Sequence, residues 1–347
     1  MAAALSRSLP RKKATPATPL LLRVRPCQRM PCPPFRKEKT TAIPRRRLTA
    51  GKIRCKTSRQ TRNAREGKTV QPDSIVKRYR RPWLFFGISL VVPWAFWFVA
   101  GAVSYQDWSG GKQVIAASLL ALLGLLAPLA TALALTAGKP DLRRDVARRL
   151  FTLRGVTPFY AAVAAFLMLA SILAAQAVSV LFGYSTDQFR LAGHFSFTSG
   201  VLPVWFLLVA APVIEELAWH AYGTDALRSR FSLFSTCMMF SAYWAIWHMP
   251  LASIKDYYHS HLVQGGLLYT ANFLISVFPF VILMNWLYYK THRNILIACV
   301  FHVTAGYFNE IFATHPDSKV IQTGLLVLLS AFVVLRERRF FFDRTIE

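Results

Sequence analysis

Two adjacent glutamates followed by a histidine form the most reactive group in the sequence. They belong to the run EELAWH, residues 215–220, at the end of a long apolar stretch. On a helix, Glu216 and His220 lie one turn apart on the same face, and Glu215 lies about 100° round the axis. Adjacent carboxylates in a low dielectric repel each other, so we expect one of them to serve as a general base. The alternative is a pair of glutamates at a helix end that extends toward water.

Two further histidines lie in later apolar runs. His248 follows Trp244 by four residues, and Pro250 after it leaves backbone carbonyls free to form a polar notch. His302 lies in a third run, and Asn309 follows it on nearly the same helix face, about 10 Å along the axis. A single histidine on an apolar helix is more often a hydrogen-bonded structural residue. Only the combination with the glutamates points to catalysis.

Two carboxylates and two or three imidazoles supply what activation of a water molecule needs. A carboxylate removes the proton, and imidazoles hold the water or stabilise an oxyanion. The same residue types suit zinc, but the sequence has no HExxH motif, and no GxSxG motif for a serine nucleophile. The pattern requires no cofactor, and a divalent metal such as zinc stays an open alternative. The residues expected to be catalytic are Glu215, Glu216, His248 and His302, and those expected to support them are His220, Trp244 and Asn309.

The elements that must position these residues are apolar runs long enough to cross a membrane. Apolar residues make up 54% of the chain and charged residues 17%, whereas a soluble protein carries about a quarter of charged residues. Ionisable residues at bilayer depth are costly and face polar cavities. We therefore expect an all-α integral membrane protein, a bundle of about eight transmembrane helices with a polar intramembrane cavity. The predicted spans are 84–105, 113–136, 158–183, 200–221, 235–252, 267–289, 295–313 and 319–335.

The basic residues of the loops predict the orientation of the bundle. If the N-terminal tail is cytoplasmic, about fourteen Lys and Arg residues fall in inside segments and about four in outside loops. This asymmetry has the direction of the positive-inside bias. We expect a multi-pass protein of the cell membrane with both termini in the cytoplasm. The outside residues are Lys112, Arg190, Lys255 and Lys319.

The N-terminal tail, residues 1–82, carries most of the net charge of +26. It holds about 24 Lys and Arg residues and about 3 acidic residues, which leaves a nearly neutral membrane domain at 83–347. The tail has no apolar periodicity and is expected to be disordered. It is typical of a transit peptide, of a polybasic arm for anionic lipid or RNA, or of a stretch upstream of the true start. We assign it no function, and expect no nucleic-acid partner for the domain.

Three smaller features are interpreted as structural. The connection 137–157 is similar to a short amphipathic surface helix, and we interpret it as a solvated linker rather than a lipid-binding element. The five cysteines include no CxxC pair. The histidines predicted to be ordinary surface residues in loops are His194, His259, His261, His292 and His315.

The order of the motifs resembles that of the CPBP intramembrane proteases. The shared pattern is a Glu-Glu pair with a basic residue after three further positions, an aromatic residue four positions before a histidine, and a later histidine in an apolar helix. The resemblance covers about residues 195–315. The family includes the CAAX prenyl endopeptidases, which trim prenylated proteins, and bacterial members linked to bacteriocin maturation or self-immunity.

The resemblance implies a fold and a role for each motif. It implies an eight-helix membrane fold with a conical cavity open to the cytoplasmic leaflet. It also implies hydrolysis of a peptide bond in a peptide or protein substrate that enters from the membrane or the cytoplasm. Glu215 would activate the water with Glu216 beside it, Trp244 and His248 would form the second motif, and His302 would begin the third. The family is often labelled metalloprotease, although its proposed mechanism can use glutamate and histidine without a metal.

Two positions depart from the family pattern and define the competing hypotheses. The first motif normally ends in Arg, where this chain has His220, and the third normally has Asn or Asp four residues after its histidine, where this chain has Gly306. The leading hypothesis is an intramembrane endopeptidase. The second is a catalytically silent family member that acts as a membrane binding or immunity protein. The third is a proton- or metal-coupled transporter, for which the sequence lacks a visible inverted repeat.

Overall fold

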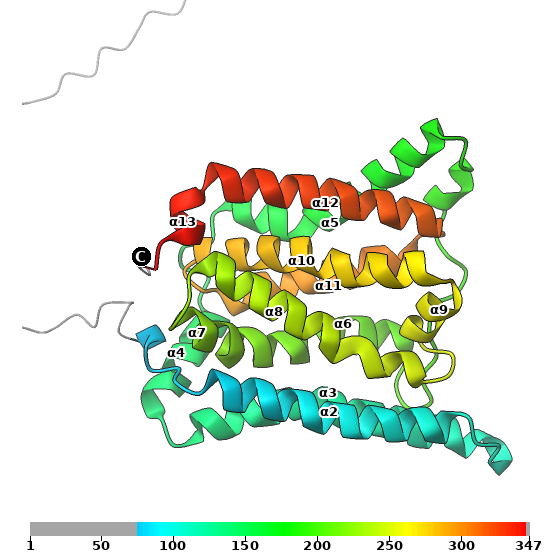
Figure 1. The fold of residues 1–347 in the computed structure, drawn as a ribbon, viewed down its shortest axis with the longest axis horizontal. Helices are drawn as coiled ribbons and strands as arrows, with labels where there is room; N and C mark the ends of the chain where they lie inside the picture. The colour runs from blue at the N-terminus through cyan, green and yellow to red at the C-terminus, as the bar shows by residue number, and fades with distance from the viewer. Residues whose placement is uncertain (1–74, 345–347) are drawn as a thin grey trace, which may run out of the picture. The chain divides into compact units, whose positions relative to one another are not determined.

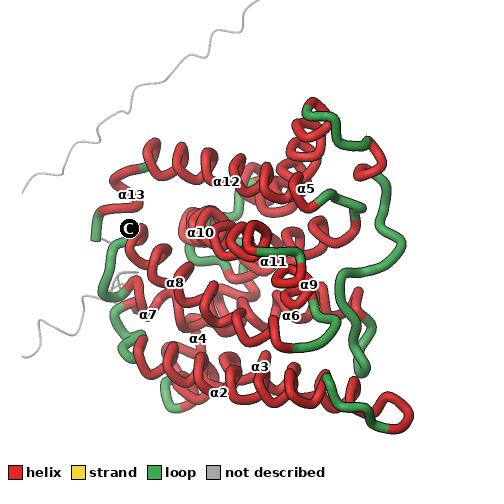
Figure 2. Tube along the Cα trace, turned by 45° about the vertical axis from the view of Figure 1, so that its right-hand side comes forward, coloured by secondary structure: helices red, strands yellow, loops and turns green. Residues whose placement is uncertain are grey.

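The computed structural model describes residues 75–344, and within that range the chain is helical with no β-sheet (Figure 2). Most connections between the long helices are short, and the longest is residues 182–203, between α5 and α6. The α-helices are α2 (Pro82–Ser104), α3 (Lys112–Ala137), α4 (Pro140–Phe151), α5 (Pro158–Leu181), α6 (Val204–Ala218), α7 (Thr224–Arg228), α8 (Leu233–His248), α9 (Tyr258–Gln264), α10 (Leu267–Lys290), α11 (Ile295–Ile311), α12 (Pro316–Arg336) and α13 (Arg338–Phe342).

The protein is an all-α membrane protein, as predicted from the composition. Six helical segments within residues 75–344 are long and apolar enough to cross a bilayer, among them Val204–Arg228, which joins α6 to α7. The predicted spans 235–252 and 295–313 correspond to shorter helices, α8 with 16 residues and α11 with 17 residues. The count of about eight transmembrane helices therefore stays a prediction.

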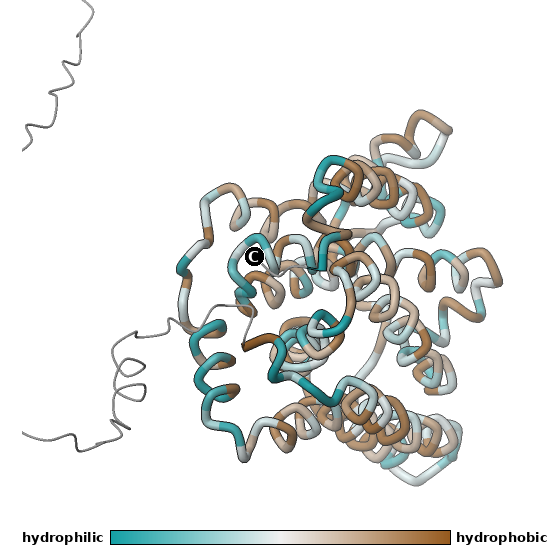
Figure 3. Tube along the Cα trace, turned by 60° about the vertical axis from the view of Figure 1, so that its left-hand side comes forward, coloured by the Kyte–Doolittle hydropathy of each residue, from teal (hydrophilic) through white to brown (hydrophobic). Residues whose placement is uncertain are grey.

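The long helices run side by side in alternating directions (Figure 1). The short helices α4, α7 and α13 lie at one end of the bundle, which we call the α4 end, and α9 lies at the other, the α9 end. The described chain begins and finishes at the α4 end. Figure 3, with the α4 end turned toward the viewer, shows hydrophilic segments in front and hydrophobic residues along the long helices. The loops with the predicted inside basic residues lie at the α4 end, but which side of the membrane this end faces stays a prediction.

The outer surface of the bundle is apolar. Leu133, Phe166, Leu328 and Phe332 are all more than 60% exposed although they lie within long apolar helices. Soluble proteins rarely expose contiguous apolar surface of this kind, whereas a lipid bilayer covers it.

The interior between α2, α3 and α8 is built from tryptophans. Trp97 and Trp247 meet edge to face with ring centroids 4.5 Å apart, and Trp219 packs on Trp247 at 5.3 Å. Trp97 donates its indole N–H to the carbonyl of Ala121 at 3.0 Å, and Trp247 donates to that of Ser89 at 2.9 Å. Because these large rings are both buried and hydrogen-bonded, they fix the helices that carry the polar residues.

The buried interior reaches beyond the predicted domain boundary at residue 83. Val76 and Tyr79 have no exposed surface. The Tyr79 hydroxyl donates to the Asp145 carboxylate in α4 at 2.9 Å. Residues 75–81, which the sequence analysis places in the tail, thus pack against the membrane domain.

Candidate active site

A change of helical pitch follows the two glutamates. Helix α6 ends at Ala218, and a π-helical turn, Trp219–Gly223, connects it to α7. Such turns are rare and often occur at functional sites. Here the turn leaves His220 beneath Glu216, and the Nδ1 atom of His220 contacts the Oε2 atom of Glu216.

Glu215 lies on the wall of the central cavity and is held by two indoles. Its Oε2 atom accepts hydrogen bonds from Nε1 of Trp244 at 3.1 Å and from Nε1 of Trp219 at 3.4 Å. Its Oε1 atom has no hydrogen bond to any part of residues 75–344, and the residue lines the cavity. One oxygen therefore orients the carboxylate, and the other is available to a water molecule or substrate.

Glu216 faces away from the cavity and joins two histidines. It is fully buried and is not among the residues of the cavity wall. Its Oε1 atom accepts a hydrogen bond from Nδ1 of His302 at 2.7 Å, while Oε2 contacts His220. The two neighbouring carboxylates thus have different environments, because they point in different directions from the same helix.

The two cavity histidines are oriented by fixed partners. Nδ1 of His248 lies 2.7 Å from the carbonyl oxygen of Trp244, which can only accept, so Nδ1 carries the proton and Nε2 is left for the cavity. His302 also lines the cavity, and its bond to Glu216 leaves its Nε2 without a partner among residues 75–344. The Trp244 ring lies between them, with its centroid 5.5 Å from that of His248 and 5.1 Å from that of His302.

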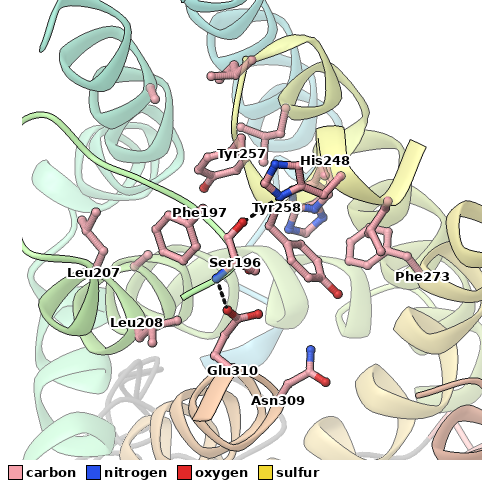
Figure 4. Close-up of a pocket in the computed structure, with 18 of the residues that line it drawn as sticks. Ser196, Phe197, Leu207, Leu208, His248, Tyr257, Tyr258, Phe273, Asn309 and Glu310 are labelled. Atoms are coloured by element: carbon pink, nitrogen blue, oxygen red, sulfur yellow. Dashed lines mark hydrogen bonds between the residues drawn. The ribbon is translucent and has the colours of Figure 1, made fainter. Parts of the chain in front are cut away.

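The cavity has a volume of about 720 Å³ and extends from Glu215 to the α9 end. Figure 4 shows its wall near that end, with His248 and Tyr258 on one side and Asn309 and Glu310 on the other. The Glu310 carboxylate accepts a hydrogen bond from the backbone N–H of Ser196 at 3.0 Å. The cavity reaches the end opposite the described chain ends. The cytoplasmic opening of the cavity and the cytoplasmic position of both termini stay predictions.

The structure brings most of the predicted residues to one part of the cavity. The others lie behind the cavity wall or closer to the α9 end. Glu215, Trp244, His248 and His302 surround one part of the cavity. His220 supports Glu216 from behind, with no surface exposed. Asn309 lines the cavity two helical turns from His302, closer to the α9 end.

Residues that the sequence analysis did not select also shape the site. Trp219 bonds Glu215, and its spacing of four residues on one helix is a signal that could have found it. His259 is not a surface residue, so that expectation is wrong: both its ring nitrogens are buried, with no hydrogen-bond partner in the described part of the chain. Its ring stacks on His248 with centroids 5.2 Å apart. Burial holds the pKa of His259 well below its ordinary value.

The open alternative of a bound metal finds no support in the ligand geometry. Across residues 75–344, no group of three or more His, Cys, Asp or Glu side chains is placed to hold a metal ion. The Nδ1 atoms of His220 and His302 are both directed at Glu216 instead. Glu216 and His220, which suit zinc by type, are therefore engaged with each other away from the cavity.

Comparison with known proteins matches the part of the chain that contains these residues. The family model described as type II CAAX prenyl endopeptidase Rce1-like matches residues 197–308, which include both glutamates and both cavity histidines. A relative named CAAX prenyl protease 2, from Methanococcus maripaludis, is 34% identical over 265 residues, or 76% of this chain and 96% of the relative.

These findings define the protein first as an intramembrane endopeptidase: a helical membrane protein whose sequence is that of a protease. More narrowly, the chain belongs to the CPBP family of intramembrane proteases, with the Rce1-like CAAX prenyl endopeptidases. An enzyme of this kind acts on a peptide substrate in a membrane setting.

Proposed function

We propose that the protein hydrolyses a peptide bond near the C-terminus of prenylated proteins, with a water molecule activated by Glu215. The observation that carries the proposal is the free Oε1 atom of Glu215, on a cavity wall shared with His248 and His302. Because both indoles bind Oε2, the carboxylate can take a proton at Oε1 without losing its orientation.

Hydrolysis needs a proton acceptor, a stabilised oxyanion and a proton donor. Glu215 removes a proton from water, and the oxygen of that water attacks the scissile carbonyl carbon. His302 donates from Nε2 to the oxyanion, while Glu216 stabilises positive charge on its ring. Glu215 then returns the proton to the leaving amine as the carbon–nitrogen bond breaks. His248 orients the water by accepting one of its hydrogens at Nε2.

The cavity wall also suits an isoprenoid chain. Between α3 and α6 it is lined by Leu122, Leu125, Leu202 and Leu207. An apolar chain gains about 0.8 kcal/mol per CH₂ group removed from water, so a prenyl group could anchor the substrate there. The name of the Methanococcus relative agrees with such a substrate.

The test compares two quenched fluorescent peptides with the full-length protein in nanodiscs. Both end in a cysteine and three further residues, and only one carries a farnesyl group. We expect the farnesylated peptide to be cleaved at least about tenfold more efficiently in kcat/KM, because the isoprenoid adds apolar burial. Equal cleavage of both would refute the prenyl part of the proposal. Loss of cleavage on treatment with a chelator, restored by zinc, would refute the metal-free mechanism.

Restoring the family's third motif should raise activity. Gly306 lines the cavity one turn after His302, and a Cβ atom added there meets nothing within 4 Å. An asparagine therefore fits, and its amide can donate a second hydrogen bond to the oxyanion. We expect Gly306→Asn to raise kcat by about tenfold. Gly306→Ala is the control, since it should raise thermal stability through helix propensity but not the rate. An Asn variant no faster than the Ala variant would exclude an oxyanion role for this position.

A further inference from the structure

A lysine at the far end of the cavity has unused hydrogen-bonding capacity. Lys319 lies in the first turns of α12 and lines the cavity. Its Nζ atom donates to the carbonyl oxygen of Asn309 at 3.2 Å and lies 5.8 Å from the centre of the Tyr258 ring. An ammonium group has three donors. Only one of them is used by residues 75–344.

No carboxylate neutralises this lysine directly. Within the described range Lys319 forms no ion pair. Among the acidic residues of the cavity wall, Glu310 is the closest to Lys319 in sequence. The carboxylate of Glu310 accepts a hydrogen bond from the backbone N–H of Ser196. The other charged residues at this end of the wall, Lys255 and Asp256, are exposed at the rim. A partly buried cation with free donors is a suitable partner for an anionic ligand group.

The distance between this lysine and the reacting groups matches a short peptide. Asn309 follows His302 by seven residues in α11, which corresponds to about 10 Å along the helix axis. Because Lys319 contacts Asn309, its ammonium group lies about that far from the level of His302. An extended peptide spans about 3.3–3.6 Å per residue, so three residues cover the same distance.

His259 lies between His248, near the reacting groups, and Lys319. His259 stacks on His248 at one side, and its ring centroid is 5.3 Å from that of Tyr258, the residue beneath Lys319, at the other. Both of its ring nitrogens are buried and have no hydrogen-bond partner within residues 75–344. The wall from His248 to Lys319 is thus formed by packed aromatic rings.

We propose that Lys319 binds the C-terminal carboxylate of the substrate, three residues beyond the scissile bond, and so selects peptides that end there. The inference rests on the proposed endopeptidase function and adds a subsite to it. The free chain end then lies toward the α9 end of the cavity, and the rest of the substrate lies on the other side of the reacting groups.

The test uses farnesylated peptides of one sequence that end either in a free carboxylate or in an amide. The parent protein should cleave the acid about 10- to 100-fold more efficiently in kcat/KM than the amide, as expected for a hydrogen-bonded ion pair. In Lys319→Gln that preference should disappear, through loss of acid cleavage with amide cleavage unchanged. Lys319→Arg should retain most of the preference. Lys112→Gln, an exposed lysine at the same end but outside the cavity wall, is the control and should retain all of it.

The outcomes separate the subsite from the enzyme. If the parent cleaves both peptides equally, or if Lys319→Gln slows both by the same factor, the carboxylate subsite is wrong and the endopeptidase proposal stands. If the parent cleaves neither peptide, both proposals are wrong. Adding one residue after the chain end should slow the parent as much as amidation does, because the carboxylate then passes beyond Lys319. Unchanged cleavage of the longer peptide would contradict the three-residue spacing.

Discussion

Glu215→Gln should abolish hydrolysis, with kcat reduced by about 1,000-fold. Positioned general bases contribute about 10²–10⁴ in rate, and an amide cannot accept the proton from water. The substitution preserves side-chain size, and its amide oxygen can still accept from Trp244 and Trp219, which now bind Oε2. The fold should therefore survive. The measurement is single-turnover cleavage of the farnesylated peptide, with the thermal transition of parent and variant recorded alongside.

The matched control is the neighbouring position, Glu216→Gln. Both oxygens of Glu216 face a histidine Nδ1 atom, and a glutamine can offer only one acceptor, so one of the two contacts is lost. We expect kcat to fall by about 10- to 100-fold, less than for Glu215→Gln, because Glu216 only orients His302. If Glu216→Gln were the slower variant, the general base would have to be Glu216, and the division of roles between the two carboxylates would be wrong.

The sequence predicted which helices contain the reactive residues. It did not predict which of these side chains face the cavity and which face away from it. Hydrophobic run length is a strong signal, so the long spans were visible. The Glu216–His220 contact followed from helical spacing alone. Glu215 faces the cavity and Glu216 faces away from it because of the rotation of α6 against α8 and α11. This rotation depends on tertiary packing and cannot be predicted from the residues of α6 alone. The same holds for the bond between Glu215 and Trp244, which lie on different helices.

Residues that meet only through tertiary structure were missed or misread. His259 lies between the predicted spans 235–252 and 267–289 and was interpreted as a loop residue, yet it packs on His248 from α8. Lys319 counted only as an outside basic residue, although it lines the cavity. The connection 137–157 contains a helix, α4, as its pattern suggested, but it is not a solvated linker: Asp145 and Arg149 are each only 4% exposed. Their partners come from α7 and the α10–α11 connection, far away in sequence.

These buried charges form a network behind the active-site helix. Arg149 lies 2.9 Å from the Asp145 carboxylate and 3.0 Å from the Asp225 carboxylate, and Arg293 pairs with both at 2.8 Å and 2.6 Å. Arg149 also donates to the carbonyl of His220, in the π-helical turn, at 2.8 Å. Burial alone would raise the pKa of Asp145, but the two guanidinium groups outweigh it and lower the pKa to about 2.

Arg149→Met should therefore be the most destabilising single substitution outside the cavity. Removing one partner of a buried ion pair leaves the other charge uncompensated, which costs about 3–5 kcal/mol. The loss should be largest at neutral pH. Asp145 has a lowered folded-state pKa, so its stabilisation is present above the unfolded value of about 4 and disappears as pH falls toward 2. The measurement is the denaturation midpoint of the full chain in detergent between pH 2 and pH 8, where the difference between parent and variant should shrink below pH 4.

Arg148→Met separates burial from charge, because Arg148 also pairs with Asp145 but is 68% exposed. A surface pair contributes about 0–1 kcal/mol, so this variant should behave almost like the parent. The two arginines are adjacent on one helix and lose the same charge, and only Arg149 holds the π-helical turn that places His220 against Glu216. Arg149→Met should accordingly lower kcat as well as stability, while Arg148→Met changes neither. Equal destabilisation by both substitutions would show that net charge at the α4 end, and not the buried network, stabilises the helix that carries the two glutamates.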